Sequence, residues 1–420
     1  MKIAILGNGG REHAIANSIS ISKKVKKIFC LPGNAGTAAI AQNIPLDINN
    51  FQLIYNFLIK EKIDLVIVGP EKPLVNGIVD YLKKRNIFVF GPNKKSSQLE
   101  GSKIFTKKIC KKYRIPTANF GIFTSEKKAN KYAKNSKLPI VVKADGLASG
   151  KGVYICNNYN ECNIAIKEIF NGKFGFAKSV LIEEFLEGQE MSFFIISDGK
   201  NFKTFQTAQD HKRVGEGDIG KNTGGMGAYC PSNLINKKLE KQIIKKIIKP
   251  TFRALQDPGH DFSGFLYAGL MIKNNNPYLI EYNVRMGDPE CQAILPLLKS
   301  DFLELMLACV KKRLNNYKIK WRRKKSMCIV LCSKGYPDKY KKNVEIKDLL
   351  RIKNNKNNYL FHAGTNKKKG KFYSVGGRVL NFVNISSSFF SSRNKIINNI
   401  KKLNWKNGFY RRDIGHQAID

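Results

Sequence analysis

The chain has 420 residues, 42% of them hydrophobic, and its 74 Lys and Arg against 32 Asp and Glu give a formal net charge of +42. This length suggests two to four domains, and the composition excludes wholesale disorder and a collagen-like repeat. No apolar run approaches the roughly 18 residues of a membrane span, and a glycine loop interrupts the apolar start after residue 6, which excludes a signal peptide. We therefore expect a soluble, cytoplasmic protein.

The basic charge has two interpretations. A pI near 9.9 is typical of proteins that bind nucleic acid. The lysines, however, are dispersed and accompanied by Asn and Ile, as in residues 354–358, and these residue types share A/T-rich codons. A base-composition bias therefore explains the charge, and we expect no specific nucleic-acid partner. The rival hypothesis, a nucleic-acid-binding protein, predicts basic residues clustered on one face among exposed aromatic side chains.

The cysteines and histidines favour neither a zinc site nor a nucleophile centre. The nine cysteines are irregularly spaced without a C-x-x-C pair, and the five histidines have no metal-ligand spacing. We expect buried, reduced thiols. A Gly-x-Ser-x-Gly motif is also absent.

Residues 1–101 are predicted to form a doubly wound α/β domain. Short apolar strands alternate with helical stretches, and each strand ends in a turn. The expected strands are 2–6, 27–31, 64–68 and 87–90, with a helix over 12–20. Such alternation predicts a parallel sheet that binds ligands at the carboxyl ends of its strands.

The rest of the chain is predicted to form two further units. Residues 102–317 begin with a helix over 102–113, and a small α+β lid follows at about 120–191. Residues 318–325 have the composition of a linker, and residues 326–420 form a small carboxy-terminal α+β domain. Further expected strands are 140–143, 152–156, 180–184, 264–272, 277–285, 327–332 and 377–383, and further helices are 161–170, one after 301, and 394–403.

The loop at residues 7–13 follows a strand and opens a helix, a context that suits anion binding. Glu12 occupies the third glycine position of a dinucleotide fingerprint, and no acid ends the second strand to hold a ribose. Arg11 favours a phosphorylated substrate instead. A bare structural turn is the alternative.

A second glycine-rich loop spans residues 143–153. It differs from a Walker A motif because Gly152 stands where Ser or Thr belongs. Lys143 ends a strand beside the loop and supplies positive charge, while glycine amides can approach phosphates closely. The alternative is a flexible hairpin beside a surface lysine.

An apolar strand at residues 180–184 leads into acidic residues. Its backbone can offer hydrogen bonds to a purine, with Phe185 and Leu186 covering the purine face and Glu190 accepting ribose hydroxyls. By itself this pattern is weak, because many edge strands share it.

Residues 278–285 carry the sharpest local pattern. Alternate residues of a strand share a face, so Glu281, Asn283 and Arg285 project together, with Leu279 continuing that face inward. An acid, an amide and a guanidinium suit a hard cation together with an anion, and Mg²⁺ prefers to bridge substrate phosphates. A solvated strand face is the alternative. Two polar loops, 210–213 and 222–228, add titratable side chains and open backbone amides.

Taken in order, these motifs resemble the glycinamide ribonucleotide synthetase family of ATP-grasp enzymes, which acts in purine biosynthesis. The resemblance runs almost end to end. It covers residues 7–13, 32–37, 67–74, 91–92, 99–103, 143–153, 182–186, 209–214, 222–229, 264–271, 281–292, 361–365, 376–380 and 413–415.

The resemblance implies a central ATP-grasp fold and the ATP-dependent ligation of glycine to 5-phosphoribosylamine, through a glycyl phosphate. It also implies roles for individual residues. These are catalysis by Lys143, Arg285 and Asp210; ATP binding by Lys103, Lys143, Gly150, Gly152, Glu183, Phe185, Leu186 and Glu190; substrate binding by Gly9, Gly10, Arg11, Asp210, Lys212, Arg213, Gly225, Met226, Arg285 and Asp288; and Mg²⁺ or Mn²⁺ binding by Glu281 and Asn283.

One departure from the superfamily concerns the metal. Many ATP-grasp enzymes carry an acid on the strand before the Glu-x-Asn pair, but residues 268–271 hold none here. The expected partners are small-molecule substrates, and the expected state is a monomer. Another ATP-grasp carboxylate–amine ligase, with different acceptor loops, is the alternative enzyme.

Overall fold

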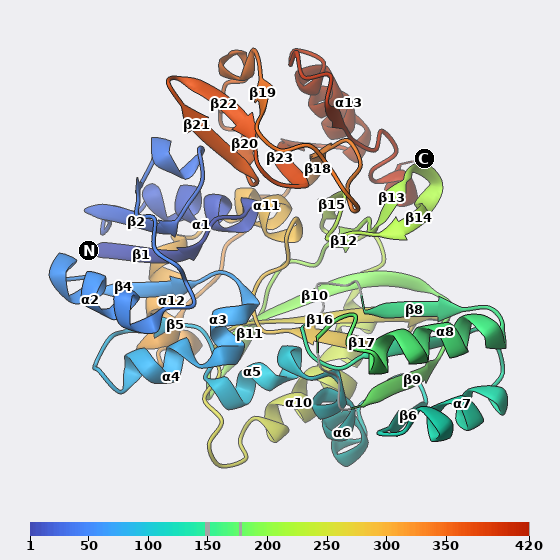
Figure 1. Cartoon of the computed structure of the whole chain (residues 1–420). Coiled ribbons are helices and arrows are strands. Elements are labelled where there is room, and N and C mark those ends of the chain that lie inside the picture. The colour runs from blue at the N-terminus through green and yellow to red at the C-terminus, as the bar shows by residue number, and fades with distance from the viewer. Residues whose placement is uncertain (148–151, 176–178, 420) are drawn as a thin grey trace.

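A computed structural model describes residues 1–147, 152–175 and 179–419 of the chain. Three regions follow one another along the sequence: an amino-terminal α/β region, a central region that carries a projecting lid, and a carboxy-terminal β-rich region stacked over the other two (Figure 1). Within the described residues, none of the helices combines the length and apolarity needed to cross a membrane.

The amino-terminal sheet is parallel, with strand order β3-β2-β1-β4-β5. Central strand β1 is buried on both faces, because Ile3 and Ile5 pack toward α1 while Ala4 and Leu6 pack toward α2 and α3. This confirms the predicted doubly wound sheet. Its elements are β1 (Lys2–Gly7), α1 (Gly10–Ser20), β2 (Lys27–Pro32), β3 (Gln42–Asn43), α2 (Phe51–Glu61), β4 (Leu65–Val68), α3 (Glu71–Asn76), α4 (Ile78–Lys83) and β5 (Val89–Phe90).

Two helices connect this sheet to the lid, α5 (Lys94–Gly101) and α6 (Lys103–Tyr113). The lid itself is an antiparallel sheet of order β6-β9-β7-β8 with two helices on one face. It projects from the lower right of the molecule in Figure 1. Its elements are β6 (Phe120–Phe123), α7 (Glu126–Lys134), β7 (Ile140–Ala144), β8 (Val153–Cys156), α8 (Tyr159–Phe170) and β9 (Val180–Glu184).

The central sheet is antiparallel with order β11-β10-β16-β17. Strand β10, an apolar run between Gly188 and Gly199, was not singled out in the sequence, although it pairs with β16 along its whole length. The elements are β10 (Gln189–Asp198), β11 (Phe202–Thr204), α9 (Lys237–Ile243), a π-helical turn (Ile244–Ile248), α10 (Lys249–Ala254), β16 (Ser263–Lys273), β17 (Asn276–Asn283), α11 (Glu290–Ile294) and α12 (Phe302–Val310).

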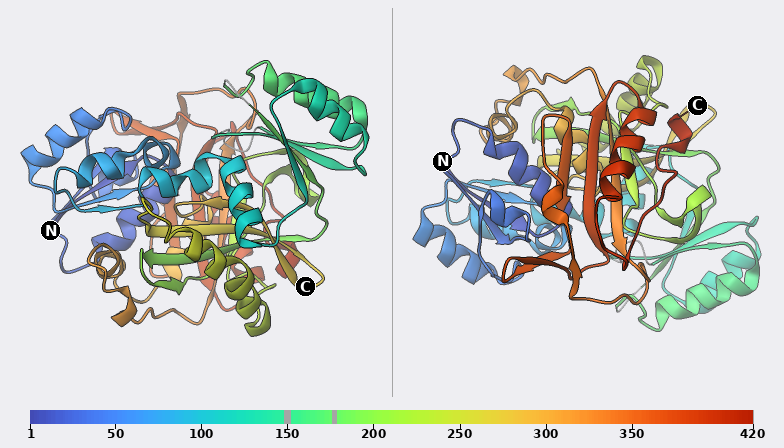
Figure 2. Two further views of the ribbon diagram at one scale, coloured as in Figure 1. Left: turned by 90° about the horizontal axis from the view of Figure 1, so that it is seen from below. Right: turned by 90° about the horizontal axis from the view of Figure 1, so that it is seen from above.

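The carboxy-terminal sheet combines strands from distant parts of the chain. Its order is β12-β15-β18-β23-β20, so β12 and β15 come from the middle of the sequence (Figure 2, right). The main strands are β12 (Gln209–Asp210), β15 (Gly227–Cys230), β18 (Lys325–Ser333), β20 (Asn358–His362), β23 (Arg378–Ser386) and β24 (Gly408–Phe409). Two small sheets pair β13 (Arg213–Gly215) with β14 (Ile219–Asn222), and β22 (Lys371–Ser374) with β19 (Val344–Ile346) and β21 (Thr365–Lys368); α13 (Phe389–Ile400) packs on β18 and β23.

The lid has a hydrophobic core of its own, centred on Val142, Ile166 and Ile182. The two larger clusters are built from residues before 116 and after 190, which we call the body. One of these joins all three regions of the body, since it contains Ile5 of β1, Phe265 of β16 and Ile329 of β18. The nine cysteines are all buried and free, as expected.

Candidate active site

The sequence-predicted nucleotide residues meet where the lid joins the body. Lys143 lies on β7 and Glu183 on β9, which are neighbouring strands of the lid sheet. Lys103 opens α6, and Glu281 lies near the end of β17 in the body. Burial lowers the pKa of Lys103. The carboxylate of Glu281 opposes this shift, whereas Lys143, a second cation close to it, adds to the shift. The lid and the body therefore contribute charges to one shared site.

The first turn of α6 fixes Lys103 against the lid. Ser102 is the N-cap, and its hydroxyl accepts from the Phe105 amide (3.0 Å) and donates to Asp145. Asp145 also accepts from the Ile104 amide (3.2 Å), and Lys103 Nζ donates to the Gly146 carbonyl (2.9 Å). The start of the glycine-rich loop is thus bonded to the helix that carries Lys103.

Glu183 is an ion-pair partner of two lysines. It is 4% exposed, and its Oε2 accepts from Lys143 Nζ at 2.8 Å. Its Oε1 lies 3.2 Å from Nζ of Lys107, a buried lysine of α6 that sequence reasoning missed. The predicted adenine-pocket role of Glu183 therefore has to accommodate a side chain held between two ammonium groups.

The predicted alternation of side chains between the two faces of the strand is correct for residues 281–285, at and just after the end of β17, but wrong for Leu279. Tyr282 and Val284 are buried in the body core, and Glu281, Asn283 and Arg285 lie on the other, half-buried side. A register shift between Gly269 and Leu270 of β16 pairs Leu279 with Leu270 and Glu281 with Gly269. Because of this bulge, Leu279 points into the same core as Tyr282, and the expectation that it continues the Glu281 face is wrong.

Glu281 is set among cations. Burial alone would raise its pKa, but Lys212, Lys143 and Lys103 hold the pKa of its carboxyl below the ordinary value. Asn283 lies beside it on the same face, and its Oδ1 accepts from Arg285 Nη2 (3.1 Å). Among the described residues, no group of three or more His, Cys, Asp or Glu side chains could hold a metal ion. One carboxylate and one amide oxygen fit a hard cation that takes its other ligands from phosphates and water, rather than a cage built by the protein.

A second charged group lies at the end of β12 and just after it. Lys212 forms an ion pair with Glu190 at 2.6 Å, so the residue expected to hold the ribose contacts one expected to hold substrate. Burial lowers the pKa of Lys212, but Glu190 and Glu281 raise it well above its ordinary value. Asp210 has a buried Oδ1 without a hydrogen-bond partner, and burial together with Glu290 raises its pKa. Gly225 makes room for this carboxylate, since a Cβ there would lie 2.6 Å from Asp210 Oδ1.

The first loop is closed by the protein's own carboxylates. Glu12 accepts from the Gly9 amide (2.7 Å) and from Arg11 Nε (2.6 Å), and Asp288 Oδ2 accepts from the Arg11 amide (3.2 Å). Arg11 is 7% exposed, and its Nη1 donates to the Met286 carbonyl. Two of the groups expected to bind a phosphate, the Gly9 amide and the Arg11 guanidinium, are therefore bonded to protein atoms.

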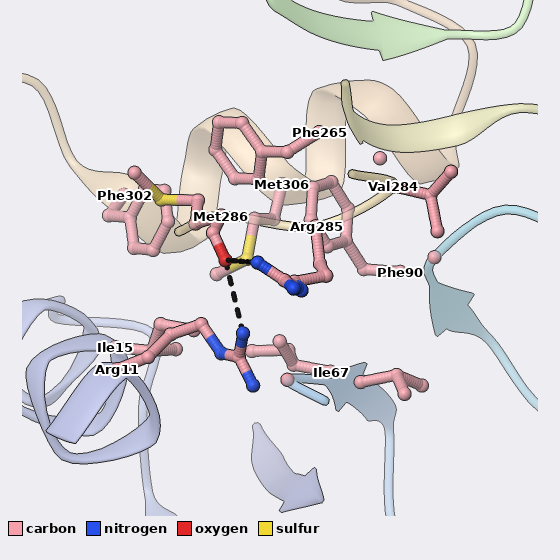
Figure 3. A pocket seen from close by; sticks show the side chains of 14 residues that line it. Arg11, Ile15, Ile67, Phe90, Phe265, Val284, Arg285, Met286, Phe302 and Met306 are labelled. Carbon is pink, nitrogen blue, oxygen red and sulfur yellow. Dashed lines mark hydrogen bonds between the residues drawn. The ribbon is translucent and has the colours of Figure 1, made fainter. Parts of the chain in front are cut away.

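Arg11 and Arg285 approach each other from opposite regions of the body. Figure 3 shows both guanidinium groups directed to the Met286 carbonyl, beside a cavity of about 20 Å³ that has room for about one water molecule. Arg285 Nη2 donates to Glu100 (2.6 Å), and its Nε lies 3.3 Å from Glu71. Arg285 thus links the end of β17 to α3 and α5.

The other predicted site residues differ in how deeply they are buried and in the contacts that they already make within the protein. Gly150 lies outside the described residues, Gly152 precedes β8, and Phe185 and Leu186 are half-buried. Met226 is fully buried, with its amide and carbonyl bonded to His211 and Val330. Arg213 donates to the Gly220 carbonyl (2.7 Å) in the β13–β14 hairpin, and a Cβ on Gly10 would meet Asn381 and Gln292. Met226 and Arg213 therefore shape the loops around the site.

Several site residues escaped sequence reasoning. Five of them are charged side chains that lie within the motif ranges but carried no predicted role: Glu12, Glu71, Glu100, Glu290 and Arg378. The sixth, Lys107, lies outside those ranges. Arg378 Nη1 lies 3.3 Å from Asp288 Oδ1 and also donates to the Gly224 carbonyl. For the five motif residues, a charged side chain close to a glycine in the sequence was a signal that could have found them, whereas Lys107 has no such neighbour.

Comparisons with known proteins agree along the whole chain. Models of the phosphoribosylglycinamide synthetase N, ATP-grasp (A) and C domains match residues 1–100, 101–291 and 326–417. Phosphoribosylamine–glycine ligase of Brucella melitensis is 43% identical over 421 aligned positions, covering 100% of this chain and 99% of that protein. The crystal structure of phosphoribosylamine–glycine ligase from Thermotoga maritima matches with a TM-score of 0.86 at 33% identity, covering 99% of this chain and all of that one.

A more distant structure shares the fold alone. The biotin carboxylase domain of Hydrogenobacter thermophilus 2-oxoglutarate carboxylase, solved with the magnesium salt of ADP and bicarbonate, has a TM-score of 0.75 at 16% identity. The match covers 97% of this chain and 91% of that chain. The matches to the three family models and to the Thermotoga maritima structure confirm the predicted three-part ATP-grasp architecture.

Proposed function

The chain belongs to the phosphoribosylglycinamide synthetase family, and from that membership we infer that it is an enzyme that joins glycine to 5-phosphoribosylamine at the expense of ATP, the second step of purine biosynthesis. Its products are glycinamide ribonucleotide, ADP and phosphate. The structural observation that carries this inference is Glu281, which lies among Lys103, Lys143 and Lys212 where the lid meets the body. We further propose that the enzyme is a cytoplasmic monomer whose partners are small molecules.

We propose that ATP lies between the lid and the end of β17. Lys103 and Lys143 are the phosphate contacts, because both ammonium groups lie near Glu281. Gly152, which precedes β8, is a further proposed phosphate contact, as is Gly150, which lies outside the described residues. Phe185 and Leu186 follow strand β9 beside the adenine, and Glu190 faces the ribose. The Lys212–Glu190 ion pair then joins the nucleotide to the acceptor side of the site.

The family and the ATP-grasp fold imply a divalent metal, and we propose Glu281 and Asn283 as its protein ligands. When bound, Mg²⁺ or Mn²⁺ supplies charge that stabilises the transferring phosphoryl group. Arg285 orients this pair, because its Nη2 donates to Asn283 Oδ1 while Glu100 holds the same nitrogen. The side chain of Asn283 is therefore fixed before any ion arrives.

We propose that glycine is activated as glycyl phosphate. A carboxylate is a poor acceptor for an amine, so its oxygen first attacks the γ-phosphorus of ATP, and ADP leaves. The amine of phosphoribosylamine then attacks the acyl carbon, and as the C–N bond forms the C–O bond to phosphate breaks and the leaving phosphate takes up the proton that the nitrogen loses. Lys143 and Lys103 stabilise charge on the phosphoryl oxygens, and a site closed to water protects the acyl phosphate from hydrolysis.

The remaining substrate proposals are Gly9, Gly10, Arg11, Asp210, Asp288 and the 222–228 loop, which line the acceptor side.

The decisive experiment is an ADP-release assay on the purified chain. We expect sustained ADP release over many turnovers only when glycine, phosphoribosylamine and a divalent metal ion are all present, and glycinamide ribonucleotide in equal amount by mass spectrometry. Replacing glycine with alanine serves as the control for the amino acid. Sustained ADP release without phosphoribosylamine, or with an unrelated amine in its place, would contradict the assignment.

A further inference from the structure

The helix before the lid contains a buried lysine to which the proposed mechanism gives no role. Lys107 of α6 is 2% exposed. Its Nζ donates to Thr117 Oγ1 (2.5 Å), and Thr117 Oγ1 in turn donates to the Leu279 carbonyl (2.6 Å). The ammonium also lies 5.5 Å from the centre of the Phe120 ring. Lysine is rarely buried unless it is paired, so this position is unusual for a helix surface.

The carboxylate that pairs with Lys107, that of Glu183, also pairs with Lys143. Glu183 Oε1 lies 3.2 Å from Lys107 Nζ, while Glu183 Oε2 accepts from Lys143 Nζ at 2.8 Å. All three side chains are less than a tenth exposed. Burial lowers the pKa of Lys107, and Glu183 opposes that effect. Two ammonium groups thus share one carboxylate, and this buried triad keeps one net positive charge.

The sharing changes what Lys143 can offer to a phosphate. In a simple Lys143–Glu183 pair the two charges would cancel, and an incoming polyanion would meet a neutral pair beside Lys103. With Lys107 on the other oxygen of Glu183, the triad stays cationic, and it lies where water screens it poorly. Lys107 comes from the body, whereas Lys143 and Glu183 belong to the lid, so the charge is completed only where the two units meet.

We propose that Lys107 is a positioning residue that sets the charge of the nucleotide site: by holding one oxygen of Glu183, it leaves Lys143 with enough positive charge to bind the phosphates of a nucleoside triphosphate. This inference rests on the proposed ATP site and extends it to a residue that does not touch the nucleotide. It differs from a structural role, because it depends on the net charge of the triad rather than on the shape of the side chain.

The test measures ATP binding by titration calorimetry with a divalent metal present and both other substrates absent. Lys107→Met should weaken binding on the order of tenfold, as expected for removing one buried charge near a polyanion. Lys107→Arg should stay near the wild-type affinity, and so should Lys108→Met, which removes the exposed neighbouring lysine of the same helix. In steady-state assays, the KM for ATP should rise in Lys107→Met more than kcat falls.

A double variant separates charge from structure. Lys107→Met with Glu183→Gln restores one net positive charge, so it should bind ATP more tightly than Lys107→Met alone. A purely structural role predicts the opposite, since a second buried contact is lost. Equal binding by wild type and Lys107→Met, or weaker binding by the double variant, would overturn the proposal. If Lys107→Met does not fold, Glu183→Gln alone decides, with tighter binding than wild type expected and weaker binding contradicting the proposal. Wild-type protein that does not bind ATP would instead contradict the proposed function.

Discussion

The lid and the body bury their apolar side chains in different ways. The lid has a small core of its own, whereas the three regions of the body share continuous clusters. Polar contacts join the two units, among them Lys107 with Glu183, and Ser102 with Asp145. On the body side, by contrast, the guanidinium groups of Arg11 and Arg285 are held within a fused interior. The geometry of the nucleotide half of the site therefore depends on a few polar contacts between the lid and the body, whereas that of the acceptor half depends on the fold of the whole body.

The largest effect should come from breaking the body at Arg285. Replacing Arg285 with Met removes the guanidinium that forms ion pairs with the buried Glu100 carboxylate and with Glu71. Removing one partner of a buried pair typically costs about 3–5 kcal/mol of unfolding free energy, which urea denaturation can measure. Arg351→Met removes an exposed pair with Asp348 and should change stability by less than about 0.5 kcal/mol. Equal stability of the two variants would contradict the idea of a fused, charge-linked body.

The junction of the two units should be sensitive in activity rather than in stability. Glu281→Gln removes the carboxylate proposed as a metal ligand, and we expect turnover at saturating ATP to fall at least ~10²-fold, comparable to the loss of an oxyanion-hole donor. The unfolding free energy should stay close to wild type, because no hydrogen bond to this carboxylate is found among the residues that the structure describes. Glu126→Gln, on the exposed face of the lid helix α7, is the matched control with full activity expected. Near-normal turnover of Glu281→Gln would contradict the proposed role of Glu281 as a metal ligand.

Acid should destabilise the body through two buried histidines. Burial lowers the pKa of His13 to about 3 and that of His362 to about 4, and His13 Nδ1 accepts from the His362 amide (2.8 Å). Below pH 6.5 the unfolded chain therefore binds protons that the folded chain does not. Stability should fall as the pH is lowered from 7 toward 4, by up to about 1.4 kcal/mol per pH unit for each histidine. Urea denaturation at pH 7 and pH 5 measures the slope, which His13→Asn should reduce; an unchanged slope in that variant would argue against the assignment.

The smallest effect should come from the helix cap beneath the lid. Ser102→Ala removes the N-cap of α6 and its bond to Asp145, at a typical cost of about 1 kcal/mol. We also expect the KM for ATP to rise, because Lys103 follows directly. Ser388→Ala removes the N-cap of α13 in the carboxy-terminal region and should cost similar stability without changing the KM. Equal KM values in the two variants would show that the cap does not support the nucleotide site.

The sequence predicted regular structure better than it predicted ion pairs. Continuous apolar runs identified β1, β7 and β9, and alternation placed Glu281 beside Asn283. The bulge at Gly269 was not visible, because it depends on how β16 pairs with β17. The last helix begins at Phe389 rather than near 394, since Ser388 caps it.

The partners of buried charges could not be predicted for a physical reason. Lys107 looks like any solvent-facing lysine in a basic helix, and its burial follows only from the approach of Glu183 across the junction. Arg11 was expected to face a phosphate, but Asp288 and Glu12, from distant and adjacent positions, occupy the groups around it. Local sequence patterns carry no information on such long-range pairing.

The shared carboxy-terminal sheet has a consequence for how the chain is made on the ribosome. Strand β15 ends at Cys230, and its partner β18 begins at Lys325. At ordinary elongation rates these roughly 95 residues take about 5–20 s to emerge, and during that time β15 has no β18 to pair with. Met226 and Tyr229 are fully buried in the finished protein, but during the same interval they lack the contacts that β18 provides. The acceptor half of the site is therefore completed late in synthesis, whereas the lid, whose core is local in sequence, can form while the rest of the chain is still being translated.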